Sequence, residues 1–90
     1  DGLRSIATPT RIVVGGSAFV LPVATWLHER LAANELVMLA PEVGHYAFLP
    51  EATDRGRRAS PDCCIDASGV DRGSVHARVA ALAAELFQSV

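Results

Sequence analysis

The stretch RIVVGGSAFVLPVATWLHERLAANELVMLAP, residues 11–41, decides the fold. It begins with a short, mostly β-branched run at 11–14 that stops at Gly15 and Gly16, which is typical of a strand followed by a turn. Residues 36–40 are apolar throughout rather than alternating, which indicates a parallel strand covered on both faces, and Pro41 closes it. A strand, a helix and a second strand in this order predict one right-handed βαβ crossover.

The helix between the two strands is predicted over 22–33. Pro22 suits the first position of a helix, and Asn34 is available to end it in a left-handed conformation. Four apolar side chains recur at helical spacing on one face: Val23, Trp26, Leu27 and Leu31. We expect Trp26, and likewise Phe87 near the end of the chain, to lie in the core.

The second half of the chain divides into a loop and a helix. Residues 41–70 hold three of the five prolines, three glycines and both cysteines, so we interpret 46–70 as an irregular, functional loop insertion with room for one helical turn. Helical periodicity then returns in a stripe of apolar residues at Val75, Val79, Leu82 and Leu86. With Asp71 as N-cap, this stripe predicts a final helix over 72–88.

The fold class is therefore α/β, with the order β-α-β-loop-α in a single region, 1–90. Ninety residues, half of them hydrophobic, make one domain near the lower size limit of independent stability. Two parallel strands leave two open edges, which intact folds cover. The pattern resembles the end of a larger α/β sheet. Because the first residue is Asp1 rather than Met, we expect a processed chain or a piece of a longer one.

Composition argues against several classes of partner. Eight arginines, no lysine and ten carboxylates give a net charge of −2, so we expect no nucleic-acid partner. The apolar runs are far shorter than the roughly 18 residues of a membrane span, so we expect a soluble chain with no membrane partner. Gly15-Gly16 is not followed by the further residues of a dinucleotide or phosphate motif. Adjacent Cys63 and Cys64 lack the spacing of a zinc site, so we expect neither cofactor nor metal.

His45 is the candidate catalytic residue. It lies immediately beyond the carboxyl end of the second predicted strand, where open α/β sheets place ligands and catalytic side chains. From its position alone, a loop histidine hydrogen-bonded to the backbone is the alternative. Position therefore makes His45 a candidate base and no more.

Two segments of the sequence resemble a known family, and the resemblance bears on the role of His45. The segments GHYAFL, residues 44–49, and GVDR, residues 69–72, together with matching positions over about 6–88, resemble the C-terminal end of α/β-hydrolases of the dienelactone-hydrolase-like kind. The resemblance implies that the two strands are the last two of a hydrolase sheet. It also implies that His45 is the base of a Ser-Asp-His triad that hydrolyses esters or lactones. A small-molecule ester would then be the substrate, in a complete parent protein only.

Two departures from the family limit the activity expected of this chain. Ala18 stands where the family offers the triad aspartate, and the Gly-x-Ser-x-Gly elbow would lie upstream of Asp1. We therefore expect the chain to be inactive alone. The resemblance also aligns Ala52 with a cysteine that would pair with Cys64, so Cys64 lacks that partner here.

Two alternative functions stay open. Ser17 could be a nucleophile served by His76 with Asp66 or Asp71, although Phe19 is too large for the flank of an elbow turn. The chain could instead be a non-catalytic remnant or interaction domain that pairs through its open sheet edges, with self-association as one form of that pairing.

Overall fold

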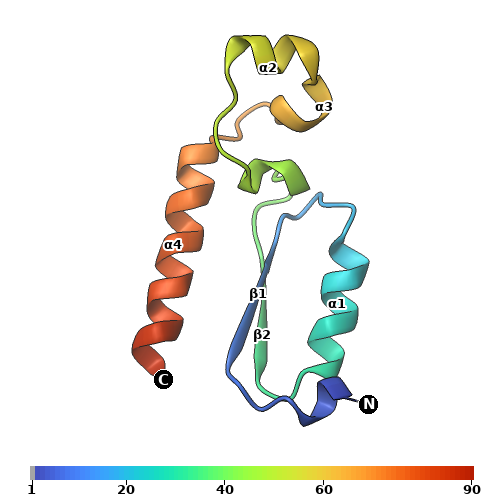
Figure 1. Ribbon diagram of the computed structural model, residues 1–90, viewed down its shortest axis with the longest axis vertical. Coiled ribbons are helices and arrows are strands. Elements are labelled where there is room, and N and C mark those ends of the chain that lie inside the picture. The colour runs from blue at the N-terminus through green and yellow to red at the C-terminus, as the bar shows by residue number, and fades with distance from the viewer. Residues whose placement is uncertain (1) are drawn as a thin grey trace.

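The structure is a computed structural model that describes residues 2–90, and it has a mixed α/β architecture (Figure 1). Its elements, with η for a 3-10 helix, are η1 (Gly2–Ser5), β1 (Thr10–Val14), α1 (Leu21–Arg30), β2 (Asn34–Met38), η2 (His45–Phe48), α2 (Asp54–Ala59), α3 (Pro61–Cys64) and α4 (Arg72–Ser89). The sheet lies between α1 and α4 (Figure 1). This agrees with the coarse prediction of an α/β chain.

The two strands pair in parallel, in a register that runs from Thr10 opposite Asn34 to Val14 opposite Met38. The second strand begins two residues earlier and ends two residues earlier than predicted. The prediction that it is covered on both faces is wrong, because Met38 is 58% exposed and no residue of β2 is fully buried. A two-stranded sheet flanked by two helices leaves part of each strand open to solvent.

Helix α1 ends at Arg30, three residues before its predicted end, because Leu31 is already extended. Asn34 therefore does not end the helix in a left-handed conformation; it is the first residue of β2. Its side chain still supplies hydrogen bonds to carbonyl groups at the helix end, since Nδ2 donates to the carbonyl oxygens of Leu31 at 2.7 Å and His28 at 3.0 Å. The expected capping role is thus performed by the side chain and not by the backbone.

The segment 46–70 is more ordered than an irregular loop with one helical turn. It contains most of η2 and the two short helices α2 and α3. Thr53 caps α2 by accepting from the amide of Gly56 at 3.1 Å, and Arg57 pairs with Asp54 at 2.8 Å. Each helix is too short to be evident from hydrophobic periodicity.

Helix α4 extends one residue beyond its predicted end. Asp71 caps it as expected and accepts from the amides of Gly73 and Ser74, each at 3.3 Å. The expectation that Trp26 and Phe87 lie in the core is wrong, because they are 46% and 73% exposed. The guanidinium of Arg30 covers the Trp26 ring at 4.2 Å instead.

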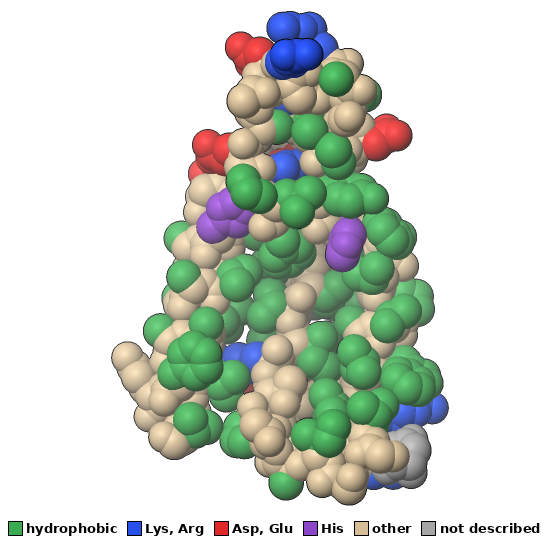
Figure 2. All heavy atoms as spheres, in the orientation of Figure 1, with side chains coloured by type: hydrophobic (Ala, Val, Ile, Leu, Met, Phe, Trp, Pro, Cys, Tyr) green, Lys and Arg blue, Asp and Glu red, His purple; other side chains and the backbone are tan. Residues whose placement is uncertain are grey.

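The core is small and the molecule is elongated. Buried side chains form two groups, Val14 with Ala18 and Ala24, and Val43 with Ala47 and Val75. The radius of gyration is 14.9 Å, against about 12 Å expected for a compact domain of this length. The accessible surface is 5895 Å², against about 5,000 Å² for a monomer of this mass. Figure 2 shows hydrophobic side chains widely exposed on the face in view.

Among the helices of residues 2–90, none has the length and apolar character needed to cross a membrane.

Candidate functional site

The turns that follow the two strands meet at the carboxyl edge of the sheet. The amide of Gly16 donates to the carbonyl oxygen of Ala40 at 3.3 Å, and the amide of Ser17 donates to that of Val43 at 3.1 Å. These two hydrogen bonds join a turn after β1 to a turn after β2. They place residues 17–19 beside residues 43–46, where sequence reasoning expects the site.

His45 is the first residue of η2 and is exposed at this edge. Its ring contacts the Phe19 ring at a centroid distance of 5.0 Å and the Tyr46 ring at 5.4 Å. Phe19 and Tyr46 are 6.1 Å apart, so the three rings form one aromatic group. Within residues 2–90 the His45 imidazole has no hydrogen-bond partner. It is therefore not the backbone-tied loop histidine of the alternative interpretation.

Two hollows adjoin His45 and Tyr46. The larger, about 460 Å³, is apolar and runs along β1 and α1 to η2. The smaller, about 130 Å³, is bordered by Ser17 and by acidic residues that include Glu42 and Asp62. His45 thus stands between an apolar groove and a polar cleft.

The acid of a triad is absent from the position that sequence reasoning assigns to it. Ala18 is only 7% exposed and packs with Val14 and Ala24, so it belongs to the core beneath α1. The next side chain, Phe19, is 69% exposed and is the one that faces His45. An acid in this turn would therefore have to replace Phe19 to lie beside the imidazole, a point that sequence spacing could not reveal.

The residues of the Ser17 alternative do not form a triad. Nε2 of His76 donates to the carbonyl oxygen of Leu49 at 2.9 Å; since a carbonyl only accepts, that nitrogen carries the hydrogen. Asp66 pairs with Arg72, and Asp71 caps α4. The base and both acids proposed for Ser17 are thus occupied in structural contacts.

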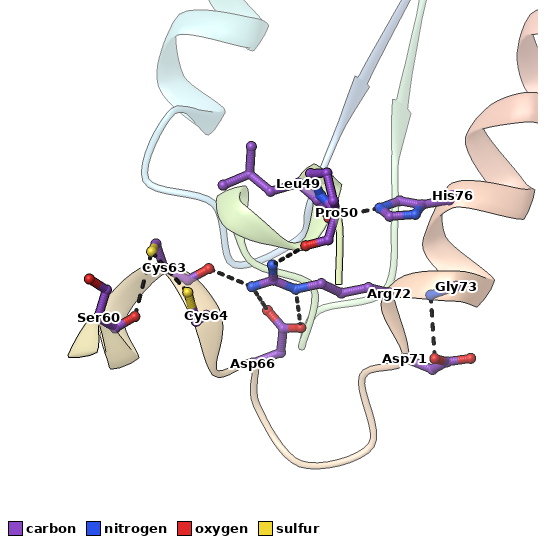
Figure 3. A network of polar contacts seen from close by, with 10 residues as sticks. All are labelled: Leu49, Pro50, Ser60, Cys63, Cys64, Asp66, Asp71, Arg72, Gly73 and His76. Atoms are coloured by element: carbon purple, nitrogen blue, oxygen red, sulfur yellow. Dashed lines mark hydrogen bonds and ion pairs between the residues drawn. The ribbon is translucent and has the colours of Figure 1, made fainter. Parts of the chain in front are cut away.

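Arg72 is the residue that sequence reasoning missed (Figure 3). It is 6% exposed and holds Asp66 with two hydrogen bonds, at 2.7 and 3.1 Å. The same guanidinium donates to the carbonyl oxygens of Pro50 at 3.1 Å and Cys63 at 2.6 Å. Arg72 therefore joins α4, α3 and the segment after η2. Its sequence signals are its place in the segment GVDR and its position directly after the N-cap, and neither indicates burial or these partners.

The charges around this junction follow from its contacts. The pKa of the Arg72 guanidinium is raised, first by the hydrogen bond to Asp66, against an opposing effect of burial. The pKa of Asp71 lies below its ordinary value of 3.8, first because the Ser74 hydroxyl donates to the carboxylate. Both groups are therefore charged at neutral pH.

Cys63 and Cys64 are free thiols. Ala52, aligned with a cysteine by the family resemblance, and Cys64 line the same cleft of about 280 Å³. In the part of the chain that the structure describes, no three potential ligands come together around a metal position.

Comparison of the chain with protein-family models, with curated proteins and with solved structures finds no match.

Proposed function

We propose that this chain is the C-terminal portion of an α/β-hydrolase of the dienelactone-hydrolase-like kind, and that His45 is its catalytic base. The observation that carries the proposal is the His45 imidazole, which is exposed where the turns after β1 and β2 join and has no hydrogen-bond partner among the described residues. Parallel sheets place catalytic side chains at this edge. A structural histidine would more commonly be tied to the backbone, as His76 is.

In this proposal the chain supplies one part of an ester hydrolysis. His45 takes the proton of a serine hydroxyl as the serine oxygen attacks the ester carbonyl, and then gives that proton to the leaving alcohol. The serine and the amides that hold the oxyanion come from residues before Asp1. The substrate class is a small ester or lactone, for which the apolar groove beside His45 offers a contact surface.

The exposed apolar surface supports a larger parent sheet. Val23 and Trp26 of α1 are 59% and 46% exposed, and β1 has only β2 as a neighbour in the described chain. A further strand at the free edge of β1, with its own helices, would cover this surface. Parallel sheets in proteins are almost always covered on both faces.

The first test concerns the chain by itself. We expect no hydrolysis of a nitrophenyl ester above buffer, because a histidine without nucleophile or oxyanion hole is only a weak general base. Turnover that is lost in His45→Ala and also in Ser17→Ala would contradict this and would make Ser17 the nucleophile, with His45 in place of His76 as its base. Turnover lost in neither variant would point to a contaminant and leave the expected result in place.

A second candidate function is an interaction domain, and the exposed apolar side chains favour it. Phe19, Met38 and Phe87 are each more than half exposed. Unpaired strand edges and exposed apolar surface promote pairing with another chain. Here the partner would be a second copy.

This candidate predicts that the sedimentation coefficient rises with concentration. The rise should be lost when Met38→Glu and Phe87→Glu are combined, because two charges then stand in the exposed apolar surface of β2 and α4. A monomer at every concentration that unfolds in one sharp urea transition would contradict it.

A further inference from the structure

Cys63 and Cys64 end helix α3, and their side chains lie against each other (Figure 3). The two Sγ atoms are 3.3 Å apart, and each residue is partly exposed. Cys63 Sγ also lies 3.5 Å from the carbonyl oxygen of Ser60. Both contacts are satisfied when Cys63 donates to Ser60 and Cys64 donates to Cys63.

We propose that Cys63 and Cys64 form a redox-active dithiol that hydrogen peroxide converts into a disulfide between neighbouring residues. The inference does not depend on the proposed hydrolase function. It rests on two partly exposed thiols that lie in contact at the end of α3. It also rests on the Arg72 guanidinium, which binds the carbonyl oxygen of the peptide between them.

The reaction balances in two steps. First, one oxygen of peroxide is transferred to the sulfur of Cys63; the O–O bond breaks, Cys63 becomes a sulfenic acid and one water leaves. Then the sulfur of Cys64 attacks that sulfur, so that the S–S bond forms, the S–O bond breaks and a second water leaves. The two thiols lose two electrons, and peroxide accepts them.

The order of the two sulfurs follows from their contact. The pKa of the Cys64 thiol is raised above its ordinary value of 9.0, first by the hydrogen bond with Cys63. With Cys63 donating to Ser60, the S–H of Cys64 points at the sulfur of Cys63 and would stabilise negative charge there. We therefore assign the attack on peroxide to Cys63 and the resolving step to Cys64.

The disulfide would be easily reduced again. Adjacent Cα atoms are about 3.8 Å apart across a trans peptide, whereas disulfides join Cα atoms about 4.4–6.8 Å apart. Every peptide of residues 2–90 is trans, so closing the bond must distort the peptide between the two cysteines. Strained disulfides have oxidising potentials and are typically labile or regulatory.

Oxidation would also reach the Arg72 junction. The peptide that must distort carries the carbonyl oxygen of Cys63, which accepts from Nη2 of Arg72 at 2.6 Å. Residues 65–67 follow directly and border the small cleft beside His45. Turning the Cys63 carbonyl away from Arg72 would loosen α3 from α4 and change one wall of that cleft.

The test uses the reduced 90-residue chain, with peroxide added in buffer and in concentrated urea. We expect a peptide that contains both cysteines to lose two hydrogens in mass and to regain them with dithiothreitol. Preorganisation of the thiols speeds the closure step, so the ratio of internal disulfide to sulfinic acid should be at least about tenfold higher in buffer than in urea. Equal ratios, or dimers linked between chains in place of the internal bond, would overturn the proposal.

Hydrogen exchange tests the link to Arg72. Amides of residues 61–70 are expected to exchange at least about threefold faster after oxidation, and the Cys63→Ser/Cys64→Ser double variant is expected to show no change after the same treatment. The double variant controls for oxidation of exposed Met38, which both proteins share. A disulfide that forms without a change in exchange would overturn the link to Arg72.

Discussion

Gly15→Ala is expected to lower the free energy of unfolding by about 3 kcal/mol. A Cβ at Gly15 would overlap the carbonyl oxygen of Val43 and would lie 2.9 Å from its carbonyl carbon. These are backbone atoms, so no flexible side chain can move aside. Relief requires the turns after β1 and β2 to separate, which breaks the hydrogen bond from Ser17 to Val43. Overpacking of this kind costs about 3 kcal/mol, a large fraction of the stability of any small domain.

Gly44→Ala is the matched control. Gly44 lies in the facing turn, and a Cβ there would meet only the Ser17 hydroxyl, at an ordinary 3.8 Å. We expect its free energy of unfolding to stay within about 0.5 kcal/mol of the parent. Urea unfolding followed by circular dichroism compares the three proteins. A Gly15→Ala variant as stable as Gly44→Ala would mean that the two turns do not interlock.

The sequence is most informative where structure is local. A β-branched run, an amphipathic segment and a second apolar run follow one another within residues 11–41, and the βαβ order can be inferred from them directly. Asp71 is a similar case, because an N-cap acts on amides two and three residues away. Such features depend on neighbours in the chain and hardly on the rest of the fold.

Prediction from sequence fails where contacts between distant residues determine the structure or the burial of a side chain. Helix α3 and the segment after η2 are held by Arg72, whose contacts with Cys63 and Pro50 span 9 and 22 residues. The exposure of Trp26 and Phe87 has a different cause: their helical faces are apolar, but no element of residues 2–90 covers them. Hydrophobic periodicity identifies a face that is suited to burial and cannot say what buries it.

In the candidate site, too, some features could be predicted from neighbouring residues and others depend on distant ones. Its location beyond β2 could be predicted from strand order, and His45 lies there. The orientation of the facing turn could not be predicted, because residues 18 and 19 differ by one position and their side chains point to different surroundings. Ala18 enters the core and Phe19 contacts His45.

The second large effect is expected for His45→Ala in the full protein encoded by the reading frame that contains this chain. Under the proposed function His45 is the base, so its removal should lower kcat for a nitrophenyl ester by at least about a hundredfold, the usual contribution of general acid–base catalysis. Phe19→Asp should raise kcat at least about tenfold, or about 1.4 kcal/mol, because it places an acid beside the imidazole. Ala18→Asp should instead destabilise the protein, since it buries a carboxylate among apolar side chains.

The most direct measurement labels that full protein with a fluorophosphonate and determines its esterase kcat, for the parent, His45→Ala and His28→Ala. His28 is the matched control, because it is exposed and bonds to Asn34 at the far end of α1. The proposal predicts one labelled serine upstream of this chain, with labelling and kcat lost in His45→Ala and retained in His28→Ala. A reading frame without such a serine, or a His45→Ala variant as active as the parent, would contradict it.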